Sequence, residues 1–277
     1  MLTRRPLLCA ALMLAVVPPA AAENGSSWSS VLADFFLGPE TREEFRWSSA
    51  LKSGATVEVK GVNGSVHAEA ARGRDVSVIA VKKGRRYAPK DVEVKVVEHA
   101  GGITVCAVYP SAGGPANECL PGAGGRMNVR NNDVSVEFTV QVPDDVGFVA
   151  RTVNGSVEVA GLKGDAEAHT VNGSVRLQAA GQGRADTVNG SIRAVLGRTG
   201  KQPAAFRTVN GSIALSLPAD ASASIRAQTV NGSISSEFPL ASTRRLTRRE
   251  LSGTIGSGGE ELELHTVNGS IRLHRAP

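Results

Sequence analysis

The phrase Thr-Val-Asn-Gly-Ser recurs through the second half of this chain and constrains its fold more than any other feature. Full copies end at Ser156, Ser174, Ser191, Ser212, Ser233 and Ser270. Two weaker copies read Val-Asn-Gly-Ser at 62–65 and Leu-Ser-Gly-Thr at 251–254. With Ser252 in the asparagine slot, the steps from Asn154 to Asn268 are 18, 17, 21, 21, 21 and 16 residues. A fixed phrase at a short, slightly variable period indicates a repeat architecture.

Short strands are predicted on both sides of the phrase. Apolar residues take the first and third places after the serine, as Val175 and Leu177 do after Ser174. Before the phrase, an apolar residue and then the threonine share one face, a period of two that is typical of half-buried strands. The slot before the threonine then faces solvent and holds Arg151, His169, Asp186, Arg207, Gln228 and His265. Alternation alone would turn the valine of the phrase outward as well, but we expect a bend there, with the valine filling a corner.

The Asn-Gly pair tolerates positive φ and therefore suits a tight reversal or a corner. In an antiparallel β-meander it would form hairpin turns, whereas in an elongated β-solenoid successive corners would stack ~4.8 Å apart. Stacked coils favour identical neighbours of Asn-Gly, because like residues lie above one another and Asn and Thr can form hydrogen-bonded ladders. The sequence thus favours an all-β solenoid with coils of about 16–21 residues, and the meander is the alternative. The predicted corners are Asn63, Gly64, Asn154, Gly155, Asn172, Gly173, Asn189, Gly190, Asn210, Gly211, Asn231, Gly232, Asn268 and Gly269.

Residues 1–22 are predicted to be a secretory signal peptide. Arg4 and Arg5 precede an apolar run at 7–17 that is too short to span a bilayer stably, and small residues lead to a cleavage point after Ala22. An uncleaved anchor is the alternative. Without the two arginines, 29 basic residues face 26 acidic ones, and this net charge of +3 argues against nucleic-acid binding. We expect a bacterial exported protein in the periplasm, at the cell surface or outside the cell, with no transmembrane segment in the mature chain.

Three regions follow this leader. Residues 23–42 are predicted to be a loose segment, residues 43–145 an irregular β region, and residues 146–277 the repeat solenoid. The stretch 109–132 is rich in Gly, Pro and Asn, which predicts a long loop. We expect the last strand, near His274, to form an open edge.

Cys106 and Cys119 are the cysteines that remain after the leader. In an exported chain, two cysteines this close in sequence are expected to pair and to pin the loop. Closing so small a loop stabilises a fold by roughly 2–3 kcal/mol in the chain-entropy model. A metal-binding pair is the alternative, but no histidine or third cysteine lies nearby in the sequence.

Four stretches outside the full repeats carry a family resemblance. They read Glu-Glu-Phe-Arg-Trp at 43–47, Ala-Thr-Val-Glu-Val at 55–59, Val-Asn-Gly-Ser-Val at 62–66 and Ile-Thr-Val-Cys-Ala-Val-Tyr-Pro at 103–110. Together with the Thr-Val-Asn-Gly-Ser units, they resemble a family of bacterial exported proteins known as putative adhesins, a domain of unknown function related to head-GIN autotransporter-adhesin-like domains. The resemblance implies a β-helix-like ladder and brings no established catalytic residues. The chain departs from the pattern between Ser233 and Ser270, where a basic stretch interrupts the series.

The sequence contains no recognisable catalytic or metal-binding motif. Its five histidines are scattered at His67, His99, His169, His265 and His274. The one charged run could meet anionic lipid, lipopolysaccharide or an acidic polymer, or it could be a solvated insertion between coils. Its basic residues are Arg244, Arg245, Arg248 and Arg249.

The function predicted from these observations is that of a non-enzymatic exported protein, adhesin-like or a scaffold or envelope sensor, which presents a repetitive β surface. The alternative is a polysaccharide-binding or polysaccharide-active β-helix with a site in the irregular region 109–145. We predict no cofactor and no metal. The partner would be an unidentified protein or polysaccharide of the envelope or cell surface, and no oligomeric state is predicted.

Overall fold

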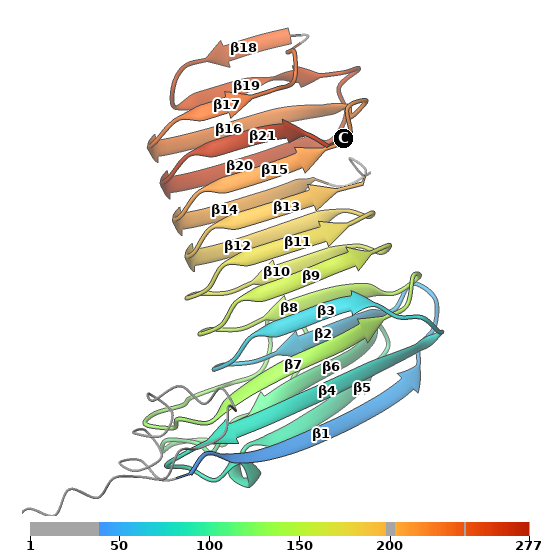
Figure 1. Cartoon of the computed structure of the whole chain (residues 1–277), viewed down its shortest axis with the longest axis vertical. Helices are drawn as coiled ribbons and strands as arrows, with labels where there is room; N and C mark the ends of the chain where they lie inside the picture. The colour runs from blue at the N-terminus through green and yellow to red at the C-terminus, as the bar shows by residue number, and fades with distance from the viewer. Residues whose placement is uncertain (1–38, 198–202, 241, 277) are drawn as a thin grey trace, which may run out of the picture.

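The computed structural model describes residues 39–197, 203–240 and 242–276, with only the backbone described at 242–246. The described residues form two large β-sheets that face each other along an elongated stack (Figure 1). Sheet A runs in the order β1 (Thr41–Ala50), β4 (Asp75–Gly84), β7 (Ser135–Val142), β3 (Val66–Ala70), β9 (Val157–Leu162), β11 (Val175–Ala179), β13 (Ile192–Leu196), β15 (Ile213–Leu217), β21 (Ile271–Arg275) and β17 (Ile234–Ser236).

Sheet B lies behind sheet A and contains the remaining strands. It runs in the order β18 (Ser242–Leu246), β19 (Glu250–Ile255), β16 (Ala223–Asn231), β20 (Glu261–Asn268), β14 (Ala204–Asn210), β12 (Gly183–Asn189), β10 (Ala166–His169), β8 (Gly147–Arg151), β2 (Thr56–Lys60), β6 (Gly102–Val108) and β5 (Glu93–His99). A single 3-10 turn, η1 (Pro89–Asp91), precedes β5.

Each coil consists of a sheet B strand, the Asn-Gly corner and a sheet A strand. Neighbouring coils pair in parallel and in register, so that β12 lies between β10 and β14 in sheet B while β13 lies between β11 and β15 in sheet A. Parallel pairing excludes the antiparallel meander for these coils and confirms the predicted β-solenoid. The core lies between the sheets and is built from alternate apolar residues of the coil strands, for example Val175, Leu177, Ile213 and Leu215.

The threonine and glycine of the phrase are explained by contacts between adjacent coils. Thr208 is buried, and its hydroxyl donates to the Gly190 carbonyl of the coil below at 2.8 Å, which satisfies a polar group that burial would otherwise leave unpaired. A Cβ added at Gly190 would lie 2.0 Å from the Gly173 carbonyl oxygen. Only glycine therefore allows the corners to stack at this distance.

The valines of the phrase are not corner fillers, contrary to our expectation. The strand alternation continues through the phrase because strands such as β14 end at the asparagine, so the chain turns only at Gly-Ser. Threonine therefore faces inward and valine outward. Between 39% and 51% of the surface of the phrase valines is exposed at Val153, Val171, Val188, Val209 and Val230.

The coils do not stack in sequence order. Strand β20 lies between β14 and β16, and β21 lies between β15 and β17, so the last coil is inserted before the coil that precedes it in sequence. The first coil behaves in the same way, since β2 lies between β6 and β8 while β3 lies between β7 and β9. The expected open edge near His274 is therefore wrong, because β21 is an interior strand.

Antiparallel strands close both ends of the stack. At one end β4 and β1 extend sheet A beyond β7, and β5 extends sheet B beyond β6. At the other end β19 and β18 extend sheet B beyond β16. The weak phrase copy at 251–254 lies in β19, where Ser252 is opposite Arg226 in an antiparallel pair. It is therefore part of this cap and not a coil corner.

Candidate partner-binding surface

Several charged side chains on the outer face of sheet B are paired with one another. The slot before the threonine forms a row in register, and neighbouring side chains of opposite charge meet across it or diagonally. His169 Nδ1 lies 3.1 Å from Asp186 Oδ2, and Arg207 forms an ion pair with Glu263 on β20. Cross-strand pairs of opposite charge stabilise a sheet, so these residues have a structural explanation without any ligand.

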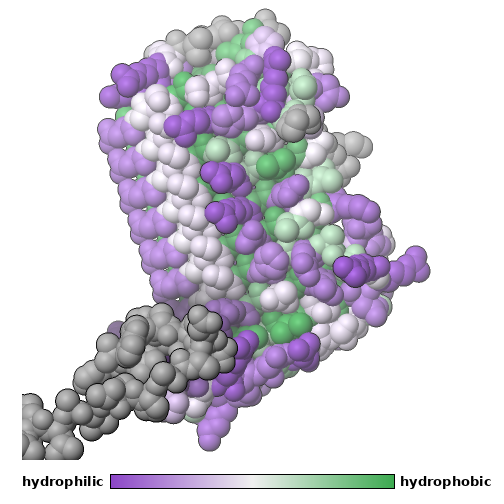
Figure 2. Space-filling model, in the orientation of Figure 1, coloured by the Kyte–Doolittle hydropathy of each residue, from purple (hydrophilic) through white to green (hydrophobic). Residues whose placement is uncertain are grey.

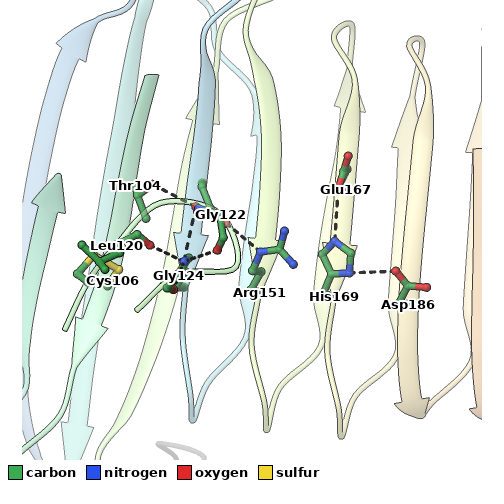
Figure 3. A network of polar contacts seen from close by, with 12 residues as sticks. Thr104, Cys106, Leu120, Gly122, Gly124, Arg151, Glu167, His169 and Asp186 are labelled. Atoms are coloured by element: carbon green, nitrogen blue, oxygen red, sulfur yellow. Dashed lines mark hydrogen bonds and ion pairs between the residues drawn. A yellow bond between two sulfur atoms is a disulfide. The ribbon is translucent and has the colours of Figure 1, made fainter. Parts of the chain in front are cut away.

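His169 is the most strongly engaged histidine of this face (Figure 3). Burial opposes protonation of the imidazole, but hydrogen bonds to Asp186 and Glu167 outweigh it and raise the pKa of His169. The hydrogen bond from His169, opposed by burial, likewise lowers the pKa of Glu167. The three side chains form an ion-pair network with no hydroxyl or thiol nucleophile in it, so it has no arrangement for covalent catalysis.

A second polar network lies where the loop that follows β6 folds over sheet B (Figure 3). Lys60 Nζ donates to the backbone carbonyls of Leu120, Gly122 and Gly124 at 2.5, 2.6 and 3.1 Å. Burial lowers the pKa of Lys60, although the nearby Glu58 carboxylate opposes this shift. The ammonium group is thus surrounded by acceptors of its own chain.

Glu58 lies at the centre of this network and is buried, with 6% of its surface exposed. Its carboxylate accepts hydrogen bonds from the Gly122 amide at 2.8 Å, the Thr104 hydroxyl at 3.1 Å and Arg151 Nε at 2.8 Å. A general acid or base must reach a substrate proton. Because these donors occupy Glu58, the geometry favours a structural role for it.

The structure joins Cys106 on β6 to Cys119 in the loop, with 5.8 Å between the Cα atoms. This disulfide holds the loop that supplies the carbonyls around Lys60. Tyr109 pins the same loop, because its hydroxyl donates to the Val134 carbonyl at 2.9 Å, and burial raises the pKa of Tyr109 to about 12. The irregular region is therefore ordered by internal bonds.

The outer face of sheet A has a different character. One row in register comprises His67, Glu158, Arg176, Arg193, Ala214, Arg272 and Ser235. Arg176 and Arg193 are directly opposite each other, and Arg272 follows after Ala214. All three arginines, which we call the arginine row, are exposed and have no ion pair within the described part of the chain.

Repulsion between the charges of the arginine row destabilises sheet A locally. Like charges directly opposite each other destabilise a sheet, and the acid beside the row does not relieve this repulsion. Glu158 is opposite Arg176 but approaches His67 instead, at 3.7 Å. At ~4.8 Å per strand, the row spans three strand spacings, roughly 14 Å along the stack. The row therefore offers unpaired positive charge to an external anion.

Sequence reasoning missed the arginine row and chose the basic run instead. Of that run, Arg248 and Arg249 are exposed in the turn between β18 and β19. Arg244 and Arg245 lie on β18, but their side chains are outside the described part. The missed signal was a repeated slot, because each arginine of the row takes the second place after the serine of its phrase.

The predicted corners form one straight column along the long edge where sheet B turns into sheet A. Each asparagine above the first donates its side-chain amide to the amide oxygen below it, at 2.8–2.9 Å, in the order Asn63, Asn154, Asn172, Asn189, Asn210, Asn268 and Asn231. Figure 2 shows a hydrophilic column along this edge beside a column of intermediate hydropathy. The asparagine ladder and the outward valines give the stack a repeating surface with the period of one strand.

Within the described ranges, no group of three His, Cys, Asp or Glu residues could hold a metal ion. The same residues include no helix with the length and apolar character needed to cross a membrane.

The chain is similar to several known proteins. Residues 148–274 match the family model described as Toastrack DUF4097. A putative cell adhesion protein from Clostridium sporogenes is 12% identical, with a TM-score of 0.44 over 84% of this chain and 100% of that one. A putative adhesin from Bacteroides fragilis is 8% identical, with a TM-score of 0.28 over 84% and 97% of the two chains. A putative lipid binding protein from Parabacteroides distasonis is 10% identical, with a TM-score of 0.24 over 87% and 98%.

No curated protein matches the chain. The segment recognised by the family model begins in β8 and ends in β21, so it contains the corner ladder from Asn154 onward and the whole arginine row. The repeat region that builds the candidate surface, residues 148–274, is thus the part of the chain that matches the Toastrack DUF4097 family model.

Proposed function

We propose that this protein is an exported, non-enzymatic, adhesin-like protein that binds an anionic polysaccharide of a cell envelope through the arginine row. The observation that carries the proposal is the contrast between the two faces. The row before the threonine on sheet B contains ion pairs, such as that of His169 with Asp186, whereas Arg176 and Arg193 are adjacent on sheet A and have no ion pair among the described residues. A polymer with regularly spaced negative groups, extended along the stack, would complement the row and relieve its repulsion.

Export is supported by two features of the chain. The leader at 1–22 has the charged start and short apolar run of a secretory signal. The Cys106–Cys119 disulfide is typical of proteins that fold in an oxidising compartment. An adhesin-like role is further supported by the column of corners, which presents the same asparagine side chain at each coil.

Binding to immobilised acidic and neutral polysaccharides tests this function. We expect the mature protein to bind the acidic polymer, with an affinity that falls as salt is added. The double variant Arg176→Gln/Arg193→Gln should bind at least about fivefold more weakly. The matched control, Arg184→Gln/Arg226→Gln, removes the same charge from exposed positions on sheet B and should bind like the wild type. Equal losses in the two variants would contradict a role for the row.

The alternative, polysaccharide cleavage, has less support. Glu58, a buried carboxylate beside the loop that follows β6, is occupied by internal donors. Incubation with the polymers that bind, followed by an assay for new chain ends, separates the two functions. Chain ends that appear with the wild type but not with Glu58→Gln would favour catalysis over simple binding.

A further inference from the structure

The stacked corners protect the Asn-Gly bonds of the phrase unequally. In all but one of these corners, the glycine N–H donates to the asparagine carbonyl of the coil above it. These bonds run from Gly64 to Asn154, Gly155 to Asn172, Gly173 to Asn189, Gly190 to Asn210, Gly211 to Asn268 and Gly269 to Asn231, at 2.9–3.1 Å. Each such bond fixes the position of the glycine nitrogen.

Gly232 is the exception, because its coil is the last in the stack. No residue in the described ranges accepts a hydrogen bond from the Gly232 N–H. The side chain before it lies at one end of the ladder. Asn231 donates to Asn268 at 2.9 Å, but no described residue donates to its own amide oxygen, whereas the amide oxygens of the other ladder members each accept one bond.

These two observations concern the atoms that react in asparagine deamidation. The backbone nitrogen of the next residue attacks Cγ of the asparagine, the bond from Cγ to Nδ2 breaks, and ammonia leaves. The resulting five-membered succinimide takes up water and opens to aspartate or isoaspartate. Glycine favours the attack because it lacks a Cβ and is conformationally permissive. A hydrogen bond from the attacking N–H opposes the step, because the bond must break before the nitrogen can move.

We infer that Asn231 is the site at which the folded protein deamidates, and that stacking protects the other phrase asparagines. The coil order decides which residue this is. A solenoid stacked in sequence order would leave the last copy, Asn268, at the open end. The inserted last coil instead gives Gly269 an acceptor at the Asn231 carbonyl and leaves Gly232 without one.

The modification has a structural consequence confined to one end of the stack. A carboxylate at position 231 can no longer donate to the Asn268 amide oxygen, so the last rung of the ladder is lost. The rungs below remain, including the one from Asn268 to Asn210 at 2.8 Å. An isoaspartate would in addition lengthen the backbone beside Gly232, which packs directly against Gly269.

The chain contains its own controls for a test. Asn189, Asn210, Asn231 and Asn268 share the six-residue sequence Thr-Val-Asn-Gly-Ser-Ile, so their rates should be equal in the unfolded chain. The mature protein is incubated at mildly alkaline pH, once folded and once in concentrated urea, and the acid content at each site is followed by peptide mass spectrometry. Asn24, which also precedes glycine but lies outside the described residues, is scored separately.

In the folded protein we expect Asn231 to convert at least about fivefold faster than the three sites that share its sequence. In urea the four rates should converge. Asn231→Gln should abolish the fast conversion, and Asn210→Gln should leave it unchanged. The inference is overturned if Asn268 is the fastest folded site, or if Asn231 converts no faster than Asn210 while the protein is folded.

Discussion

Asn268 donates its side-chain amide to Asn210 across 58 residues of sequence, and the coil that carries Asn231 lies beyond them both. This contact shows that the last coil of the chain is inserted into the stack and not added to its end. The insertion is compatible with the identity of the phrase, because the inserted corner makes the same asparagine contacts as its neighbours. The close packing between coils leads to the first two predictions.

Gly190→Ala should lower the free energy of unfolding by about 1–3 kcal/mol or more, because the added Cβ would meet the Gly173 backbone carbonyl at 2.0 Å. Gly73→Ala is the matched control, since a Cβ there has nothing within 4 Å, and it should change stability by less than about 0.5 kcal/mol. Urea unfolding followed by circular dichroism measures both. Similar losses in the two variants would show that the corners are not tightly stacked.

Exchanging threonine and valine should lower the free energy of unfolding more at Thr208 than at Val209. Thr208→Val removes the buried hydrogen bond to Gly190 and should cost about 1 kcal/mol. Val209→Thr changes a side chain that is 40% exposed and should cost less than about 0.5 kcal/mol. Denaturant melts of the two variants check the outward position of the valine. A larger loss of stability at Val209 would instead support a valine that fills the corner.

Reduction of the Cys106–Cys119 disulfide should lower the melting temperature, because the loop that surrounds Lys60 would be held less firmly. The expected loss is roughly 2–3 kcal/mol from loop closure. Differential scanning calorimetry with and without reductant measures the shift. The double variant Cys106→Ser/Cys119→Ser should melt at the same temperature in both conditions. A wild-type melt that ignores the reductant would contradict a structural role for the bond.

His169 should make stability depend on pH. Its pKa is raised in the folded protein, so the stabilisation is fully present below the unfolded value of 6.5 and is lost as pH rises through the higher folded value. The free energy of unfolding of the wild type should therefore fall over this window relative to that of His169→Gln. Urea melts at closely spaced pH values measure the difference. If the difference in free energy of unfolding between the two proteins stays constant with pH, the network of His169 with Asp186 and Glu167 does not contribute to the pH dependence of stability.

The recurring Thr-Val-Asn-Gly-Ser phrase and the alternation around it predicted the stacked coils. The alternation around Ser174 indicated strands, and the identity of the residues beside Asn-Gly indicated stacked parallel coils rather than hairpins. The position of the valine was misjudged because alternation and corner geometry gave opposite answers, and only the backbone shows that β14 continues to Asn210. The cysteine spacing suggested the joined pair that the structure contains.

Long-range order could not be obtained from the sequence. The phrase at Asn268 is identical to that at Asn210, so nothing local specifies which coils lie on either side of it. The same limit hid the arginine row, because Arg193 and Arg272 become near neighbours only once the inserted coil is placed. The carbonyl groups around Lys60 come from a loop whose pinning the cysteines predicted, but no residue pattern predicts where its backbone carbonyls point.

The insertion of coils into the stack also affects when the sheets can form during synthesis and what a deletion would do. Strands β20 and β21 are synthesised after β16 and β17, yet they lie between β14 and β16 and between β15 and β17, so neither sheet can be completed before they are made. Deleting them would not shorten the protein by one unit but would open a gap between β14 and β16. A further coil could not simply follow β21, because β21 already lies between β15 and β17.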